Sequence, residues 1–273
     1  MKQIWKTLAV ACLTAASLIA CKKDAKEAEV IKDEISQETL VKIEHLGFSS
    51  KNVQKTSDGY LVEGDINLTD ELLNSTPEHK LLRVGDEEQY RTTNLVRNLP
   101  RTITVKVVNL GTAFVSGTDL AISRYNALNL QLRFQRITSG TAGITIQGFN
   151  EGPSGGYITL GSSGFPTSSG NPYGTVQMNT NAAAYGSNPD VNYVGSVIQH
   201  EIGHCIGFRH TDYMNRAYSC GGSAVNEGAS NIGAILVPGT PSGPDPNSWM
   251  LACSNGGNRT FNTNDRTALN YLY

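Results

Sequence analysis

Three of the five histidines in the chain lie close together, as His200, His204 and His210 in the stretch QHEIGHCIGFRHTD. On a helix, His200 and His204 lie one turn apart on the same face, so both imidazoles can reach a single metal ion. Gly207 can adopt a positive φ angle, end the helix and turn the chain sharply, which allows His210 to approach the same ion. The stretch therefore predicts a helix that ends at Gly207 and a metal site with three histidine ligands.

Glu201 follows the first of these ligands and sits beside the same helix face. It can hold a water molecule on the ion while staying out of the ligand set, which is the position of a general base. Three neutral imidazoles leave one position of a tetrahedral Zn2+ open for that water. The competing interpretation is a helix with histidines satisfied in a core, and it does not account for an acid and a glycine in register with them. One catalytic zinc is the expected cofactor; calcium stays undecided, because no Asp-rich loop of known spacing appears.

The string HEIGHCIGFRH matches the metzincin pattern His-Glu-x-x-His-x-x-Gly-x-x-His at every fixed position. Metzincins also have a methionine turn below the metal, and Met250 in DPNSWMLAC resembles the Ser-x-Met core of that turn. Its expected role is to form a soft floor under the imidazoles, although a core methionine on an ordinary loop would look the same. Some metzincins carry a metal-binding tyrosine two residues later; here that position is Ala252, so no tyrosine ligand is expected.

The resemblance extends beyond the zinc motif. HEIGH followed by HTD resembles the bacterial group called dual-action HEIGH metallopeptidases, over most of the chain from about Ser36, and the terminal NTNDRTALNYLY resembles the end of matrixin catalytic domains. The resemblance implies hydrolysis of peptide bonds and an α+β, zincin-like catalytic domain with a twisted mixed sheet, an active-site helix and a C-terminal helix. It also implies a cleft whose edge strand pairs with an extended substrate. We expect that edge strand within residues 157–165.

A rival hypothesis is a surface lipoprotein that binds metal or polymer without turnover. An intact Glu201 argues against it, because a structural zinc site has no use for that carboxylate. A structural site would also fill its fourth position with cysteine or histidine, and Cys205 points about 100° away from its neighbour His204 on the helix. For Asp212 two roles remain possible: it accepts a hydrogen bond from a ligand imidazole, or it is a simple cap or surface acid.

Composition narrows the choice of partners. The chain has 22 Lys and Arg against 24 Asp and Glu, and no basic stripe stands out. Nucleic acid is therefore not an expected partner. A protein or peptide substrate is expected instead, but the irregular region 211–249 that would shape its binding pocket cannot be folded from its pattern.

The N-terminus reads as a secretory signal. Lys2 and Lys6 precede an apolar run, residues 8–20, that is too short to span a bilayer as a permanent helix. The run ends in LIAC, which resembles a bacterial lipobox with Cys21 as the lipidated residue; the alternative is an ordinary signal with a chance cysteine. Acyl chains would hold the protein on a bacterial membrane, at the outer membrane or cell surface, through the anchor alone.

The remaining chain divides into parts. Residues 1–20 are the expected signal, 21–35 a charged tether, 36–90 a small α+β region like a prosegment, and 91–273 the catalytic domain. Within the last of these, a helix is expected to begin at Thr118 or Asp119. Helix and hairpin patterns, the latter turning at Asp58-Gly59, support the small region.

Cysteine usage follows from this layout. Cys12 leaves with the signal, which leaves Cys205, Cys220 and Cys253 in an oxidising compartment where pairing is expected. These three allow one bridge and one free thiol. We favour Cys220–Cys253, because Cys205 lies on the histidine helix and can point into its core, but the other pairings stay open.

A secreted peptidase needs restraint before it reaches its place of work. A cysteine switch is excluded, because the segment before the catalytic domain has no cysteine except Cys21. The segment does contain LVEGDINLTDE, which resembles the Phe-x-Gly-Asp motif of astacin prosegments, with Val62 in place of Phe. There Gly64 would allow a close approach and the Asp65 carboxylate would bind the zinc. The alternative is a hairpin strand ending in a turn, where Gly-Asp is common.

Overall fold

The helix that carries the histidine motif forms where the sequence predicts it. The computed structural model describes residues 35–46, 48–74, 89–154, 156–228, 232–241 and 243–273, and helix α5 spans Val191–Ile206. The Asp190 side chain accepts a hydrogen bond from the Tyr193 backbone N–H and so caps its first turn. Gly207 ends the helix with φ 114° in a left-handed conformation.

A mixed sheet supports this helix, as predicted. It has five strands in the order β6-β5-β7-β9-β8, parallel except for the antiparallel pair β8 and β9. Its strands are β5 (Arg101–Val107), β6 (Leu132–Arg136), β7 (Ile144–Phe149), β8 (Gly161–Ser162) and β9 (Thr175–Asn179). Strand β8 forms one edge and is shorter than the region 157–165 that the sequence suggested. Regular pairing with β9 is limited to the two residues of β8.

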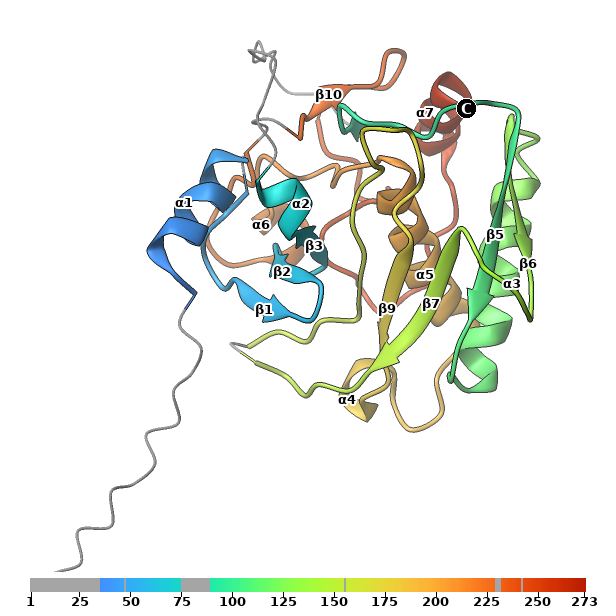
Figure 1. Ribbon diagram of the computed structural model, residues 1–273, viewed down its shortest axis with the longest axis horizontal. Helices are drawn as coiled ribbons and strands as arrows, with labels where there is room; N and C mark the ends of the chain where they lie inside the picture. Colours follow the sequence, from blue (N-terminus) through green and yellow to red (C-terminus); the bar gives the residue numbers. More distant parts are fainter. Residues whose placement is uncertain (1–34, 47, 75–88, 155, 229–231, 242) are drawn as a thin grey trace, which may run out of the picture. The chain divides into compact units, whose positions relative to one another are not determined.

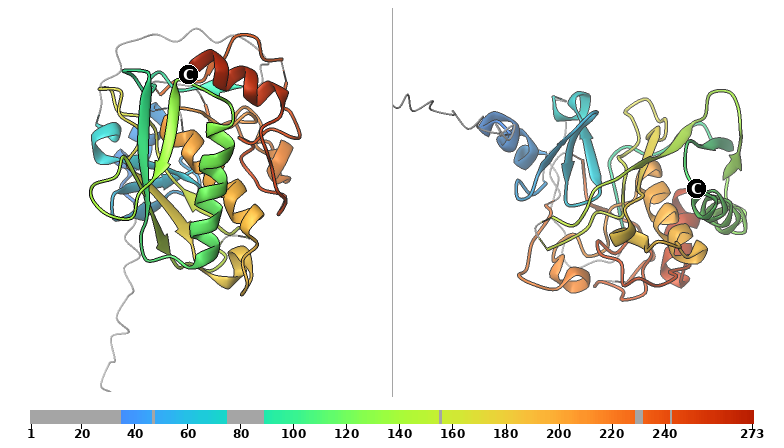
Figure 2. Two further views of the ribbon diagram at one scale, coloured as in Figure 1. Left: turned by 90° about the vertical axis from the view of Figure 1, so that its right-hand side faces the viewer. Right: turned by 90° about the horizontal axis from the view of Figure 1, so that it is seen from below.

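Helix α3, Thr112–Asn126, packs beside α5 on one face of the sheet, as Figures 1 and 2 show. It begins earlier than expected, because Gly111 starts it without any side-chain cap. Thr118 lies inside the helix, where its hydroxyl donates to the Phe114 carbonyl one turn back. A threonine that bonds to its own helix in this way looks like a cap in the sequence.

The N-terminal segment (described residues 35–74) forms a small apolar unit of its own. It contains α1 (Gln37–His45), β1 (Gln54–Thr56), β2 (Gly59–Val62), β3 (Ile66–Thr69) and α2 (Asp70–Leu73). The strands form an antiparallel sheet in the order β1-β2-β3, with the predicted turn at Asp58-Gly59. Figure 1 shows this sheet on the side of β9 away from β5 and β6. Its apolar side chains share a cluster with Phe165 and Ile232 of the later chain.

The residues just after position 88 are part of the larger body rather than of the N-terminal segment. Strand β4 (Tyr90–Arg91) pairs with β10 (Ile235–Leu236), and the Gln89 side chain donates to Ser248 and Asp265. Residues Ile35–Tyr273 form one compact unit. The predicted domain boundary at 90 therefore falls inside a paired strand, and Gln89 and Tyr90 pack with the residues that follow.

The remaining elements complete the described chain. Helix α7 (Thr263–Leu272) begins after Asn262, which caps it in a capping box with Asp265. The short helices α4 (Ala182–Tyr185) and α6 (Ala217–Cys220) lie in connections. Cys220 forms a disulfide with Cys253, the pairing favoured from the sequence, and Cys205 is buried as a free thiol. Among the residues that the structure describes, no helix is both long and apolar enough to cross a bilayer.

Candidate metal centre

The structure brings the three motif histidines together. The ring centroid of His204 lies 4.7 Å from that of His200 and 4.8 Å from that of His210, and the centroids of His200 and His210 are 5.4 Å apart. Helix α5 presents the first two from one face, and the turn after Gly207 brings His210 back to them. All three rings are shielded from solvent, with His204 and His210 fully buried.

Hydrogen bonds fix which nitrogen of each ring faces the centre. The Nδ1 of His200 lies 2.9 Å from the Trp249 carbonyl oxygen, and that of His204 lies 2.8 Å from the Phe208 carbonyl oxygen. A carbonyl can only accept, so each Nδ1 carries the proton and each Nε2 carries a lone pair. In the same way, His210 directs Nδ1 at a carboxylate oxygen of Glu227, 2.9 Å away.

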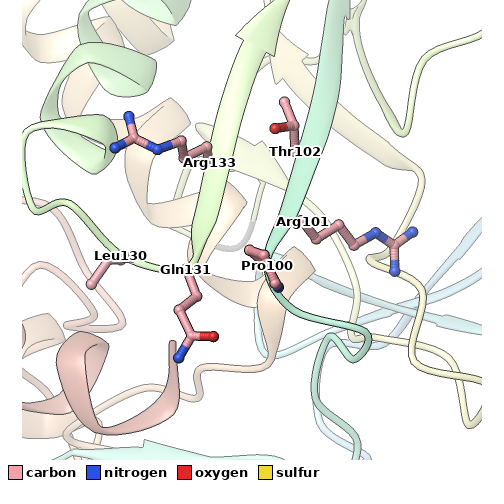
Figure 3. Close-up of a pocket in the computed structure, with 6 residues that line it drawn as sticks. All are labelled: Pro100, Arg101, Thr102, Leu130, Gln131 and Arg133. Atoms are coloured by element: carbon pink, nitrogen blue, oxygen red, sulfur yellow. The ribbon is translucent and has the colours of Figure 1, made fainter.

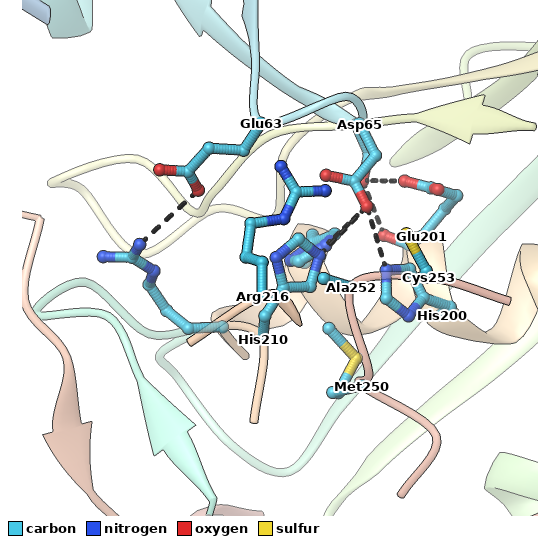
Figure 4. Close-up of polar contacts among 12 residues, drawn as sticks. Glu63, Asp65, His200, Glu201, His210, Arg216, Met250, Ala252 and Cys253 are labelled. Carbon is cyan, nitrogen blue, oxygen red and sulfur yellow. Dashed lines mark hydrogen bonds and ion pairs between the residues drawn. The ribbon is translucent and has the colours of Figure 1, made fainter. Parts of the chain in front are cut away.

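Asp65 of the N-terminal segment completes this group. Its Oδ2 atom lies 3.0 Å from Nε2 of His210, 3.4 Å from that of His200 and 4.0 Å from that of His204. The loop between β2 and β3 delivers the side chain, and Figure 4 shows it pointing at the histidines. This residue was predicted from the resemblance of LVEGDINLTDE to the Phe-x-Gly-Asp motif of astacin prosegments.

These four side chains fit a zinc ion. Within the described residues, Nε2 of His200 and of His204 are buried without a hydrogen-bond partner. Lone pairs and a carboxylate oxygen that face one another repel unless a cation lies between them. Ligand atoms around a tetrahedral zinc are separated by about 3.3 Å, given zinc–ligand bonds of about 2.0–2.1 Å. The four ligand atoms lie within 4.8 Å of one another, so the donor set and its spacing suit that ion.

Glu201 lies next to the centre and is held by the edge of the sheet. Its Oε2 accepts a hydrogen bond of 2.7 Å from the Ser163 hydroxyl. Burial, followed by the negative charge of Asp65, raises the pKa of Glu201 well above its ordinary value, and the bond from Ser163 acts in the opposite direction. A carboxylate with a raised pKa accepts a proton more readily near neutral pH. No motif in the sequence indicates this role for Ser163.

The predicted methionine turn lies below the histidines, with Met250 fully buried. A Cβ atom on Gly203 would come within 2.7 Å of the Met250 sulfur and 2.5 Å of the Trp249 ring. The glycine of HEIGH is therefore needed for close packing of α5 on the turn, a role that the sequence analysis missed. Ala252 stands where some metzincins have a tyrosine ligand, and its methyl group cannot bind a metal.

The acid that orients His210 is Glu227, not Asp212. Asp212 is buried, and its carboxylate accepts bonds from the Ala252 backbone and the Ser219 hydroxyl. It ties the loop after the motif to the chain after Met250, so neither role considered for it from the sequence is correct. Glu227 lies in an irregular region without a pattern, which is why the sequence did not reveal it.

A separate hollow lies at the start of β5 and β6 (Figure 3). It is lined by Pro100, Arg101, Thr102, Leu130, Gln131 and Arg133. None of the metal-centre residues lines it, and it carries no acid or histidine. It therefore offers no second candidate for the chemistry.

Comparison with known proteins agrees with the geometry. The sequence profile of the family described as dual-action HEIGH metallo-peptidase matches residues 60–273. No curated protein matches the chain. Two solved structures of myroilysin are similar to this chain at 14% sequence identity. The similarity to the first extends over 67% of this chain and 98% of the myroilysin chain, with a TM-score of 0.44. The similarity to the second extends over 66% of this chain and 86% of the myroilysin chain, with a TM-score of 0.41. The matched region includes Gly64 and Asp65 as well as the three histidines. The chain belongs to the dual-action HEIGH metallopeptidase family.

Proposed function

We propose that the protein is a zinc-dependent endopeptidase that cuts extended polypeptides, with Glu201 as general base. The observation that carries this is the convergence of three histidine Nε2 atoms, each with its proton fixed on Nδ1, beside a buried glutamate. A centre that only bound metal would not need that glutamate. This favours catalysis over the alternative of an inactive metal- or polymer-binding lipoprotein.

His200, His204 and His210 would hold the ion. Zinc in that position supplies a Lewis acid for the scissile carbonyl and lowers the pKa of a bound water. The carboxylate of Glu201 takes a proton from the attacking water and then passes it to the leaving amine. The Ser163 hydroxyl keeps Glu201 directed at the centre during both transfers.

The substrate would lie along the edge of the sheet as an added strand. Support comes from the N-terminal segment, which already uses that edge. The Ser163 N–H donates to the Asp65 carbonyl at 2.8 Å, and the Asn67 N–H donates to the Ser163 carbonyl at 2.6 Å. An extended chain can therefore pair at this position directly above Glu201.

The same contacts support latency. Asp65 would occupy the coordination position that a catalytic water needs, so the full-length chain would be a zymogen. We first expect release near EEQYRTTN, at residues 87–94, where the segment meets the catalytic domain. Because Gln89 and Tyr90 are bonded into the larger body, we place the release before Gln89.

Replacing Asp65 by alanine should make the full-length protein active without processing, because the fourth position at the metal is then free. The measurement is hydrolysis of a quenched fluorescent peptide, with intact mass confirming that no cleavage has occurred. The control is Asp58→Ala, which removes an exposed acid from the β1–β2 turn. If Asp65→Ala stays silent while the trimmed enzyme is active, the segment blocks the cleft by bulk alone.

Casein or gelatin zymography tests the activity itself. We expect clearing bands that disappear with a chelator and return when zinc is added. Clearing bands that persist in the presence of the chelator would contradict the proposal. The absence of clearing bands from the trimmed, zinc-loaded protein would contradict it as well.

We further propose that Cys21 carries the lipid that holds the protein on a bacterial membrane; it lies outside the described residues. Cys21→Ser should abolish acylation and move the protein to the soluble fraction, measured by fractionation and mass. Cys12→Ser is the matched control, since that cysteine would leave with the signal. Membrane retention and an unchanged lipidated mass in Cys21→Ser would show that the lipobox interpretation is wrong.

A further inference from the structure

A buried group of charges lies beside His210, on the side away from Glu201. Arg209 is fully buried, and its Nη2 atom is 3.6 Å from Glu227 Oε2 and 3.7 Å from Glu63 Oε2. Arg216 places Nε 3.1 Å from Glu227 Oε1. Three of these side chains belong to the larger body, whereas Glu63 comes from the N-terminal segment (Figure 4).

The pocket that Glu63 occupies contains the Arg209 guanidinium. The Arg209 guanidinium is sandwiched between rings, 4.9 Å from the centroid of Phe48 and 5.5 Å from that of Tyr213. Yet within the described residues Nε and Nη2 of Arg209 are buried without a hydrogen-bond partner. A guanidinium in a dry site with spare donors binds carboxylates strongly and in a fixed geometry.

Glu63 fills this pocket at a cost to the backbone. It is a non-glycine residue with φ 57°, in the left-handed region, and only 3% of its surface is exposed. Such conformations persist only when surrounding contacts enforce them. Its Oε1 atom accepts a hydrogen bond of 3.3 Å from the Ser49 backbone N–H, whereas its Oε2 atom lies 3.7 Å from Arg209 Nη2, which is longer than a hydrogen bond. A carboxylate arriving on a different chain could therefore bind more closely than Glu63 does.

Removal of the N-terminal segment would leave the pocket positively charged. The carboxylates of Glu63 and Asp65 would both be removed. Arg209 would become exposed, because the Phe48 ring would no longer cover it. Two guanidinium groups would then share the single carboxylate of Glu227, next to His210. Phe165 and Ile232, which pack against the segment, would form apolar surface nearby. Buried charges that lose their partner are strongly destabilising, so the pocket favours a replacement anion.

We propose that Arg209 and Arg216 form a specificity pocket for an acidic side chain of the substrate, and that Glu63 is its occupant in the latent chain. This rests on the endopeptidase activity proposed above and goes further by naming a substrate class. The pocket takes aspartate or glutamate close to the scissile bond, on the side that lies over His210. Apolar residues are favoured next to it.

The test uses the full chain with Glu63→Ala and Asp65→Ala together, which removes both carboxylates of the segment from the pocket and from the metal position without truncation. Peptide pairs that differ only by Glu against Gln, at each position within two residues of the cleaved bond, are compared by kcat/KM. At one position we expect a preference for Glu of about 10- to 100-fold, the range for hydrogen bonds to a charged group. In this background, Arg216→Gln or Arg209→Gln should bring the Glu-to-Gln ratio of kcat/KM near one, mainly through a change in KM. Arg216→Lys should restore part of the preference for Glu.

Controls separate the pocket from the catalytic machinery. Arg136→Gln, which removes an arginine that pairs with Asp119 elsewhere on the sheet, should leave the preference unchanged. Zinc content and melting temperature identify any variant that has lost its fold. The same acid and amide peptides are also tested for binding to the Glu201→Gln form by fluorescence anisotropy. If no position shows a preference for the acidic peptide in cleavage or in binding, the pocket proposal is wrong. If the protein binds acidic peptides selectively but cleaves none of them, the pocket proposal is supported and the endopeptidase proposal is wrong.

Discussion

Replacing Glu201 by glutamine should leave a folded, zinc-loaded protein whose peptidase activity is about 10²- to 10⁴-fold lower, the usual contribution of general acid–base catalysis. Glutamine keeps the shape and still accepts the bond from Ser163, but it cannot take a proton from water. The effect should appear in kcat rather than KM, measured on the trimmed or Asp65→Ala protein with a fluorescent peptide.

The matched control is Glu151→Gln, which neutralises an exposed glutamate in the loop after β7. It should retain full activity. If Glu201→Gln hydrolyses peptides at the rate of the parent while binding the same amount of zinc, Glu201 is not the general base and another group must accept the proton.

Replacing any of His200, His204 or His210 by alanine should remove most of the metal. The purified protein should contain about one zinc per chain, since the donor set forms a single tetrahedral site. Each histidine contributes one of three protein nitrogens, so in the trimmed or Asp65→Ala protein the loss of one leaves two ligands, which do not hold zinc stably. The measurement is zinc per chain by mass spectrometry after dialysis against a weak chelator.

His45→Ala provides the comparison, because this exposed histidine belongs to α1 rather than to the motif. Zinc content should be unchanged there. Melting temperatures of the motif variants with and without added zinc should converge, while the parent is stabilised by the ion. Unchanged stoichiometry in all three motif variants would end the zinc-site proposal.

The parts of the site that could be predicted from the sequence depend on local signals. Asp190 and Gly207 mark the two ends of α5 by capping and by a positive φ angle, so the helix and the geometry of His200 and His204 follow from nearby residues. The mixed sheet was expected from the family resemblance. Met250 and Asp65 were identified because short motifs around them resemble known families.

The parts that were missed depend on contacts between distant, irregular segments. Glu227 reaches His210 from a loop with no periodic pattern, and Ser163 reaches Glu201 from just beyond a very short edge strand. Ser163 is not part of β8 itself but follows its last residue, and neither position has a neighbour that specifies its partner. The pairing of Glu63 with Arg209 joins segments that only the folded chain brings together. The predicted start of helix α3 was too late because the residue that precedes the helix, Gly111, has no side chain to signal a cap.

The hydrogen bond from His200 to the Trp249 carbonyl has a consequence for the order of events during synthesis. The imidazole is oriented by a residue made well after it, and the turn that carries Trp249 is in turn bonded to Asp265, close to the C-terminus. The ribosome therefore finishes Asp65, the inhibitory residue of the latency proposed above, long before the last supports of the centre exist. At no stage of translation is there a chain with a completed centre that lacks its own inhibitor, so a newborn molecule cannot digest its neighbours while it is still being made.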